Sequence, residues 1–328
     1  MNLKEIFEKF ESLNVLIIGD VMIDAYLWGN VNRISPEAPV PILNVQKKEQ
    51  RLGGAANVAL NIQSLGAKPI LCSVIGADSE GENFLRLMEI NGLDRRGLVQ
   101  SQHRITTVKH RILAASQHLL RIDSEIDRNI DEEEQEHIWV RIQELLPLVQ
   151  VVVFEDYDKG VISKELIEKT VALANQLHIP TVVDPKKRNF NFYKNVTLFK
   201  PNLKELKEGL KVDFDATDND ELVKAIALLQ QNLESKAVMT TLSERGVMIY
   251  TPEAHHHIPA HIRTIADVSG AGDTVISVAA LCVALQLPSE LVAALSNLAG
   301  GLVCEYQGVV PIQKQKLLVE ALQKNLLS

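Results

Sequence analysis

The chain has 328 residues, of which 46% are hydrophobic and 23% are charged, and its formal net charge at pH 7 is −8. This length is sufficient for one large domain with a substantial core. The acidic balance excludes a general nucleic-acid-binding protein, which normally carries a basic face, but it leaves room for local basic sites that bind phosphate.

Cysteine usage and the N-terminus indicate the compartment. Cys72, Cys282 and Cys304 are isolated in apolar surroundings, which predicts buried thiols in a reducing compartment and neither a disulfide framework nor a zinc site. Residues 1–14 have the pattern of a charged amphipathic helix rather than a signal peptide, and no apolar run reaches membrane-spanning length. The expected location is the cytoplasm, with no membrane partner.

The first predicted strand is residues 14–19 (NVLIIG), a short apolar run typical of a buried parallel strand whose carboxyl end opens onto a ligand crevice. Asp20 and Asp24 follow it, and both could bind sugar hydroxyls; turn or helix capping is the alternative. Residues 26–45 are more polar and contain three prolines, Pro36, Pro39 and Pro41, which favours edge strands or a flap over the central sheet. This segment is a candidate lid.

A glycine-rich segment, Gly53 and Gly54 followed by Asn57, opens a helix predicted to run to about Leu65. The Asn57 amide offers donors and acceptors to a polyol, although close packing alone would also explain the glycines. A strand at residues 69–74 and a helix at about 79–91 follow.

Residues 105–113 and 118–122 have the pattern of a hairpin around Ala115-Ser116-Gln117, which would complete the lid. Basic residues concentrate there and further along the chain, at Lys109, Arg111, Arg121, Lys186, Lys187 and Arg188. A solvated charged face is the usual explanation for such runs. A phosphate on the substrate would give some of them a binding role.

From residue 131 onward, helices and strands alternate. Strands are predicted at 151–154, 181–183, 196–199, 237–241 and 246–250, and helices at 131–146, at 163–177 and after Asn202 and Asp218. This alternation indicates βαβ units and a parallel sheet, and no repeat or linker divides the chain. We expect one domain of residues 1–328, with a lid from about 26–45 and 104–123 inserted in it.

Asn202 and Glu205 lie in the run KPNLKE, where Pro201 ends a strand and Asn202 takes the N-cap position of a helix. A capping box explains this spacing by itself. Alternatively, the two side chains hold the water shell of an Mg²⁺ ion that bridges nucleotide phosphates, because Mg²⁺ keeps most of its waters. The segment from Thr240 to Gly246 joins two strands, either as a plain hairpin or as a loop that meets ATP.

Residues 255–257 are three consecutive histidines. Neighbouring residues of a strand point to opposite faces, so we do not expect them to bind one metal ion together.

The run DVSGAGDTV, residues 267–275, precedes a segment that is apolar almost all round, which predicts a helix buried in the core. Gly270 and Gly272 then lie at its N-terminus, where free N–H groups and the helix dipole favour an anion. Asp273 could take the proton of a substrate hydroxyl while the amides stabilise a transferring phosphoryl group. This is the outline of a small-molecule kinase, and helix capping by Asp273 is the alternative.

These motifs occur together and in order. GGAANVA, NLKE after a strand and DVSGAGD before a buried helix resemble the ribokinase-like (PfkB) carbohydrate kinases over essentially the whole chain. More narrowly, VNRISPEAPVPIL, RLGGAANVALNIQSLGA, DYDKG, DPK, KPNLKE and TLSERG resemble the bacterial D-glycero-β-D-manno-heptose 7-phosphate kinases, free-standing or as the kinase half of a bifunctional heptose kinase/adenylyltransferase. The resemblance implies a three-layer α/β sandwich with a mainly parallel central sheet and a small β-sheet lid.

The resemblance also implies roles for individual residues. Asp273 would be the catalytic base, and Gly270, Ala271 and Gly272 the anion hole. Asn202 and Glu205 correspond to the family's magnesium motif. Nucleotide contacts are expected at Thr241, Ser243, Glu244, Gly246 and Asn297, and substrate contacts at Asp20, Asp24, Gly53, Gly54, Asn57, Lys109, Arg111 and Lys186.

The implied reaction is transfer of the γ-phosphoryl group of ATP, with Mg²⁺, to the anomeric hydroxyl of heptose 7-phosphate, an early step toward nucleotide-activated heptose for lipopolysaccharide. Val268-Ser269 departs from the threonine-containing pattern of many members, so a monovalent cation near Asp267 stays open. Because the kinase-like part reaches the end of the chain at Ser328, the adenylyltransferase step would need a separate protein. Relatives often pair their lid strands across a two-fold axis, which predicts a homodimer, and edge strands need cover in any case.

Three alternatives stay open. The same chemistry could act on another sugar or sugar phosphate, or the protein could be a catalytically silent sugar-phosphate sensor, against which the intact Asp273, Asn202 and Glu205 count. A dinucleotide-binding dehydrogenase is suggested only by the α/β alternation, and GDVMID follows the first strand in place of a G-x-G-x-x-G loop.

Overall fold

Short apolar runs form the central sheet of the computed structural model, which describes residues 1–114 and 117–327. The strands are β1 (Asn14–Gly19), β4 (Lys68–Gly76), β5 (Leu98–Ser101), β8 (Val151–Glu155), β9 (Thr181–Asp184), β10 (Leu198–Phe199), β11 (Ala237–Thr241), β12 (Val247–Tyr250) and β13 (His255–Ile258). They lie in the order β13-β12-β11-β10-β9-β8-β1-β4-β5. All neighbours from β11 to β5 are parallel, and β12 and β13 add an antiparallel edge.

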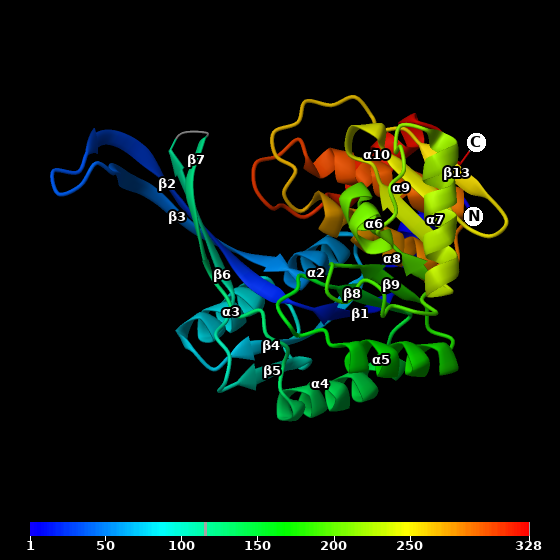
Figure 1. The fold of residues 1–328 in the computed structure, drawn as a ribbon, viewed down its shortest axis with the longest axis horizontal. Coiled ribbons are helices and arrows are strands. Elements are labelled where there is room, and N and C mark those ends of the chain that lie inside the picture. Colours follow the sequence, from blue (N-terminus) through cyan, green and yellow to red (C-terminus); the bar gives the residue numbers. More distant parts are fainter. Residues whose placement is uncertain (115–116, 328) are drawn as a thin grey trace.

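Helices cover both faces of this sheet. One face carries α1 (Leu3–Phe10), α2 (Ala55–Ser64), α3 (Ser79–Ile90), α8 (Ala271–Ala284), α9 (Ser289–Val303) and α10 (Lys314–Gln323). The other face carries α4 (Glu132–Leu145), α5 (Lys164–Gln176), α6 (Leu203–Leu210) and α7 (Asn219–Leu233). Alternate side chains of β1 enter the two cores, Val15 and Ile17 on the first face and Leu16 and Ile18 on the second. The result is a three-layer sandwich, with α4 and α5 on the opposite side of the sheet from α2 and α8 (Figure 1).

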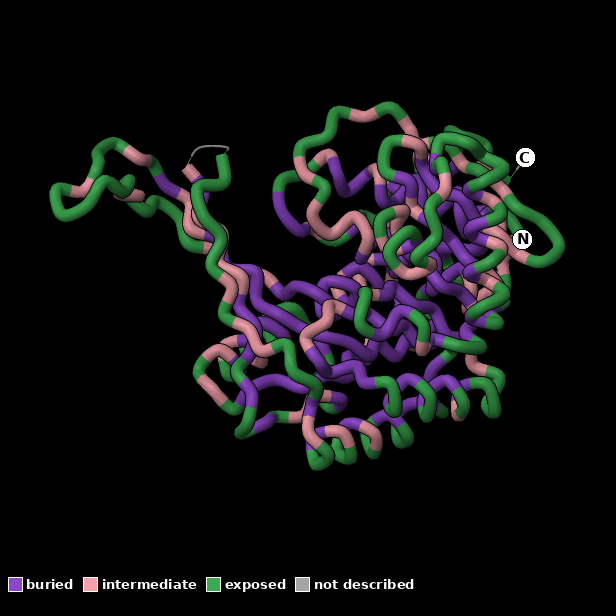
Figure 2. Tube along the Cα trace, viewed as in Figure 1, coloured by how far each residue is buried: buried purple, intermediate pink, exposed green. Residues whose placement is uncertain are grey.

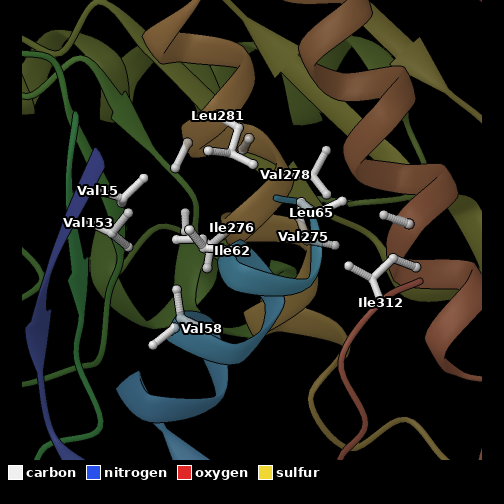
Figure 3. Close-up of a cluster of buried hydrophobic side chains, with 14 of the residues drawn as sticks. Val15, Val58, Ile62, Leu65, Val153, Val275, Ile276, Val278, Leu281 and Ile312 are labelled. Carbon is white, nitrogen blue, oxygen red and sulfur yellow. The ribbon is translucent and has the colours of Figure 1, made fainter. Parts of the chain in front are cut away.

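The first core joins the sheet to two buried helices. Val15 and Val153 of the sheet face Val58 and Ile62 of α2, and α8 contributes further apolar side chains (Figure 3). Eight consecutive residues of α8 from Val275 to Cys282 are buried, which confirms the helix predicted to be apolar all round. This packing fixes the N-terminus of α8 over the carboxyl ends of the strands.

A second, smaller sheet projects from the body (Figure 1). It consists of β2 (Val21–Ile34), β3 (Pro41–Gly54), β6 (Val108–Ala114) and β7 (Gln117–Ser124), in the order β3-β2-β6-β7. Its base is buried, and its outer end is exposed (Figure 2). The turn expected around Ala115-Ser116-Gln117 lies outside the described residues except for Gln117, which begins β7.

Agreement with the sequence is closest for buried elements. The predicted strand at residues 14–19 is confirmed at both ends, and the three histidines treated as part of a strand lie in β13, whereas β5, a short strand at the other edge of the sheet, was not predicted. An edge strand has one strand neighbour and therefore needs no long apolar run. Within the described residues, no helix is long and apolar enough to cross a membrane.

The core between α2 and the sheet yields a stability prediction. Ile62 is fully buried, so Ile62→Ala should lower the free energy of unfolding by about 2–5 kcal/mol through lost burial and the cavity left behind. The control is Ile90→Ala in α3, where the side chain is 67% exposed and the effect should stay within about 0.5 kcal/mol. Urea denaturation measures both, and equal effects of the two changes would contradict the packing described above.

Candidate active site

The carboxyl ends of neighbouring parallel strands place a row of polar residues beneath α8. In the strand register, Gly19 of β1 pairs with Glu155 of β8, and Glu155 pairs with Asp184 of β9. Lys200 follows β10 directly, and its ammonium lies 2.8 Å from Asp184 Oδ2. Glu155, Asp184 and Lys200 are all buried, so this row is a charged floor with little access to solvent.

The N-terminus of α8 lies on this floor. Gly270 is the N-cap residue, with a φ of 78°, and Ala271, Gly272 and Asp273 form the first turn. A Cβ added to Gly272 would be 3.5 Å from Asp184 Oδ2 and 3.8 Å from Lys200 Nζ. The Ala271 N–H donates to the Val268 carbonyl at 3.3 Å. The neighbouring N–H groups of the first turn, which have no partner inside a helix, are therefore concentrated beside a buried ion pair, and a helix N-terminus favours anions.

Asp273 is held by two side chains from other elements. Asn57 Nδ2 of α2 donates to Asp273 Oδ2 at 2.6 Å, and the Tyr157 hydroxyl donates to Oδ1 at 2.7 Å. Burial raises the pKa of the Asp273 carboxyl, and the two hydrogen bonds act in the opposite direction. Asp273 is thus a buried carboxylate at the start of a helix, with both oxygens oriented.

Glu155 is the unusual member of the floor. It is buried, and neither carboxyl oxygen has a hydrogen-bond partner among the described residues. Burial, assisted by the nearby charges of Asp184 and Asp273, raises its pKa well above the ordinary value. The Glu155 carboxyl therefore keeps its proton to a higher pH than an exposed glutamate does.

On the small sheet, the expected substrate residues gather on the face turned toward the body. Asp24 pairs in register with Arg51 and with Lys109, and it forms an ion pair with Arg111. A Cβ at Gly53 would approach Asp24 Oδ2 to 2.3 Å, so close packing requires this glycine whether or not it also contacts a ligand.

Lys109 and Lys159 both lie against the carboxylate of Glu125, and the sequence analysis did not single out Lys159. The ammonium group of Lys109 lies 4.0 Å from Glu125 Oε2, and that of Lys159 lies 2.7 Å from Glu125 Oε1. Two cations therefore meet at one carboxylate beside the inner face of the small sheet.

Asp20 has a different environment from Asp24. It is 1% exposed, and its carboxylate accepts backbone hydrogen bonds from Tyr157 and Lys159 on Oδ2 and from Val161 on Oδ1, at 2.9 to 3.0 Å. These contacts give Asp20 the role of anchoring the loop after β8. The Asp20 carboxylate has almost no exposed surface, so the structure adds no support to the hypothesis that Asp20 contacts the sugar.

On the side expected to bind the nucleotide, the capping box predicted at α6 is present. Asn202 Oδ1 accepts from the Glu205 N–H at 2.9 Å, and Glu205 Oε2 accepts from the Asn202 N–H at 2.8 Å. Glu205 Oε1 also accepts from Lys186 Nζ at 2.8 Å. Capping thus accounts for the spacing of the two residues and positions their oxygen atoms together.

A hollow of about 580 Å³ lies beside this capping box, and Asn202, Thr241, Ser243 and Glu244 all contribute to its lining. The expected contacts Gly246 and Asn297 are not part of that lining. Asn297 of α9 instead donates from Nδ2 to the Pro259 carbonyl at 2.9 Å. Within the described part of the chain, no three or more His, Cys, Asp or Glu side chains are grouped so as to hold a metal ion.

Four residues of the site were not predicted individually: Glu155, Tyr157, Lys159 and Lys200. A usable signal existed for Glu155 and Lys200, since each directly ends or follows a buried apolar strand run, where parallel sheets open onto ligands. For Tyr157 and Lys159 the segment DYDKG entered only through its resemblance to a family. Nothing in the sequence pattern indicates that the Tyr157 hydroxyl meets a residue 116 positions away.

Comparison with known proteins places this geometry in a family. The model of the pfkB family carbohydrate kinases matches residues 12–315. The bifunctional protein HldE of Helicobacter pylori (strain P12) is 39% identical over 263 residues, covering 80% of this chain and 57% of that protein. The bifunctional protein HldE of Desulfatibacillum aliphaticivorans is 37% identical over 309 residues, covering 94% of this chain and 63% of that protein. The chain thus spans about three fifths of the length of these relatives.

Solved structures share the fold. Phosphofructokinase-2 from Escherichia coli, in complex with fructose-6-phosphate, superposes with a TM-score of 0.76 at 17% identity, covering 94% of this chain and 98% of that one. Arabidopsis thaliana ribokinase, complexed with ribose and ATP, gives 0.72 at 15% identity, with coverages of 93% and 98%. The predicted ribokinase-like α/β class, with a mainly parallel sheet and a smaller β-sheet, is confirmed.

The buried Glu155 yields a pH-dependent stability prediction. An unfolded chain ionises glutamate above about pH 4.3, whereas the folded-state pKa is raised, so folding takes up a proton and stability falls as pH rises above that value. Glu155→Gln removes this proton uptake. The variant should match the parent near pH 4.5 and become more stable from pH 5 upward, by at most about 1.4 kcal/mol per pH unit.

Urea denaturation at pH 4.5 and at pH 7.5 measures this difference. The control is Glu144→Gln on the exposed side of α4, which should show the same small effect at both values. A Glu155→Gln effect that does not change with pH would show that Glu155 is ionised in the folded protein.

Proposed function

The chain belongs to the pfkB family of carbohydrate kinases, and we propose that it transfers the γ-phosphoryl group of ATP to the anomeric hydroxyl of D-glycero-β-D-manno-heptose 7-phosphate. The observation that carries the kinase chemistry is Asp273, oriented in the first turn of α8 beside glycines whose N–H groups favour an anion. The choice of sugar rests on the long segments that resemble heptose 7-phosphate kinases. In this proposal the product is a precursor of nucleotide-activated heptose for lipopolysaccharide.

Asp273 acts as the general base in this proposal. Each carboxylate oxygen can accept more than one hydrogen bond, so Asp273 can accept the substrate hydroxyl while Asn57 and Tyr157 stay bound. The proton moves to Asp273 as the hydroxyl oxygen attacks the γ-phosphorus atom, the bond from that phosphorus to the β,γ-bridging oxygen breaks, and ADP leaves. The N–H groups of Gly270 and Gly272 then face the charge on the transferring group, and that of Ala271 joins them when it exchanges the Val268 carbonyl, 3.3 Å away, for a phosphoryl oxygen.

The nucleotide binds in the hollow beside α6 in this proposal, which Asn202, Thr241, Ser243 and Glu244 line. The amide and carboxylate oxygens of Asn202 and Glu205 are hard donors of the type that Mg²⁺ binds, directly or through water. Bound there, Mg²⁺ would neutralise phosphate charge and orient the phosphates. The ATP named for the Arabidopsis ribokinase structure, which has the same fold, supports this choice of phosphoryl donor.

The inner face of the small sheet supports a sugar substrate that already carries one phosphate. Lys109 and Lys159 both lie against Glu125, and a phosphate group has the charge and the acceptors to compete with that carboxylate. Asn57, which is bonded to Asp273, and Asp24, which is paired with Arg111, are the proposed contacts for the sugar hydroxyls. We therefore propose that the small sheet acts as a lid of the single kinase domain and excludes water when the phosphosugar binds.

The outer face of the small sheet supports a homodimer. Leu120 and Ile122 alternate with the charged Arg121 along β7, and their side chains are 55% and 49% exposed. Ile112 of β6 pairs with Leu120, so the apolar surface extends across two strands. A second copy of this sheet is an occupant of matching chemistry, and it would also protect the sheet edges.

A substrate panel tests the proposed reaction. ADP release from ATP and Mg²⁺ should be rapid with D-glycero-β-D-manno-heptose 7-phosphate and at background with fructose 6-phosphate, ribose or buffer. Turnover with another sugar alone would keep the kinase and replace its substrate. No turnover with any sugar would remove the proposed reaction and favour a sensor.

In the same assay, Asp273→Asn is the matched control for the base. It keeps the shape of the side chain and should lower kcat roughly 10²- to 10⁴-fold, the usual contribution of a positioned general base, while ATP binding measured by calorimetry persists. A folded Asp273→Asn variant with full activity would refute this role.

The dimer is tested by its apolar face. Leu120→Asp buries a charge in the proposed interface and should convert a dimer into a monomer at micromolar concentration, as measured by sedimentation velocity. Leu228→Asp on α7, a similarly exposed leucine far from the small sheet, should leave the assembly unchanged. A monomeric parent protein at these concentrations would contradict the dimer.

A further inference from the structure

Asp273 receives one hydrogen bond from a helix and one from a loop. Asn57 comes from α2, which packs directly against α8, so its donor is fixed by the packing of two helices. Tyr157 comes from the loop after β8, and its hydroxyl reaches the other oxygen of the same carboxylate. Because a carboxylate only accepts, the proton of this 2.7 Å hydrogen bond belongs to Tyr157.

The loop that carries Tyr157 is anchored at its backbone. Asp20 accepts hydrogen bonds from the N–H groups of Tyr157, Lys159 and Val161. The Arg104 guanidinium donates to the Lys159 carbonyl from the other side. The phenol ring of Tyr157 is covered by the Lys186 ammonium, 5.5 Å from the ring centre. Backbone and ring are therefore both held before any ligand binds.

We propose that Tyr157 is a positioning residue for phosphoryl transfer, whose hydroxyl orients the Asp273 carboxylate and keeps it ionised for its work as a base. This inference rests on the proposed function, because it assigns Tyr157 a task in that reaction. A carboxylate at the start of a helix can rotate about its terminal torsion, and donors on both oxygens remove that freedom. Without Tyr157, one oxygen loses its donor, although the helix and the fold stay in place.

The surroundings of Asp273 determine the direction in which its pKa moves when the Tyr157 hydroxyl is removed. Burial favours the neutral acid of Asp273, and so does the charge of Asp184, whereas the charge of Lys186 favours the carboxylate. Glu155 also lies close by, and its own pKa is raised by burial and by the charges of Asp184 and Asp273. The hydrogen bonds from Asn57 and Tyr157 stabilise the ionised form. Removing the Tyr157 hydroxyl therefore raises the pKa of Asp273, so that the base becomes protonated at a higher pH than in the parent.

Tyr157→Phe tests the proposal. With the sugar that the parent phosphorylates, kcat at neutral pH should fall about 10- to 100-fold, the range expected for one hydrogen bond to a charged group, with little change in the KM for ATP. The acid limb of the kcat–pH profile should move to higher pH. An unchanged kcat and an unchanged acid limb would overturn the proposal.

Tyr193→Phe is the matched control. Tyr193 is fully buried, and its hydroxyl donates at 2.9 Å to Asp156, a buried carboxylate next to Glu155 in the chain but not part of the proposed machinery. The same atom is removed at similar structural cost, so thermal stability should respond comparably in the two variants. Only Tyr157→Phe should move the acid limb, and a similar shift in Tyr193→Phe would assign the effect to general loosening of the fold.

A second measurement separates this inference from the proposed reaction. The side-chain carboxyl carbon of Asp273, labelled with ¹³C and assigned by its loss in Asp273→Asn, can be titrated by NMR without any substrate. Its midpoint should lie at higher pH in Tyr157→Phe than in the parent, and equal midpoints would overturn the inference. If no sugar is phosphorylated, the proposed function fails, while this titration still decides whether Tyr157 controls the ionisation of Asp273.

Discussion

The register between α2 and α8 is the constraint on which the candidate site depends. Both helices are largely apolar where they meet. Apolar contacts alone only weakly fix how far one helix slides along the other or rotates about its own axis. A polar seam runs between them: Asn57 bonds Asp273, and Asn61, one turn later, accepts from the Thr274 hydroxyl at 3.1 Å. Asn61 also accepts from the Ile312 N–H at 2.9 Å, which ties the segment before α10 to the same point. The contacts that align the helices therefore also aim the proposed base.

The charged floor beneath α8 lowers the stability of the folded protein, because it buries ionisable side chains away from water. Asp184 Oδ2 and Lys200 form an ion pair in the interior, whereas neither carboxyl oxygen of Glu155 has a hydrogen-bond partner among the described residues. A buried group of this kind remains only where the surroundings fix it, and unpaired polar groups of this kind concentrate at functional sites. The floor lies under the helix N-terminus and beside Asp273, so local stability and the electrostatics of phosphoryl transfer are set by the same few side chains.

The small sheet has two chemically different faces. Alternation along β6 and β7 sends Lys109, Arg111 and Arg121 to one face and Ile112, Leu120 and Ile122 to the other. The charged face turns toward the body, where Arg51 donates to the Val309 carbonyl at 2.8 Å. Gly308, next to Val309, donates its N–H to Asp267 at 2.9 Å, just before the glycine motif. A movement of the small sheet would thus be transmitted to the loop that leads into α8.

Local patterns in the sequence predicted local structure. The contacts that were not predicted join residues far apart in the chain, and this is the physical reason that they were missed. Buried strands such as residues 14–19 and the capping box at Asn202 and Glu205 depend on neighbours within a few positions, and both were predicted correctly. The bonds of Asp20 to the loop at 157–161, and of Tyr157 to Asp273, join residues more than one hundred positions apart, and each needs the strand order before it can be seen. Asp20 illustrates the consequence. As a residue after a buried strand it has the pattern of a ligand contact, yet the loop after the neighbouring strand β8 supplies three backbone N–H groups that already hydrogen-bond its carboxylate. The position of a residue at the edge of a parallel sheet therefore indicates that its chemistry matters, but only the folded neighbours decide whether that chemistry serves a ligand or the loop beside it.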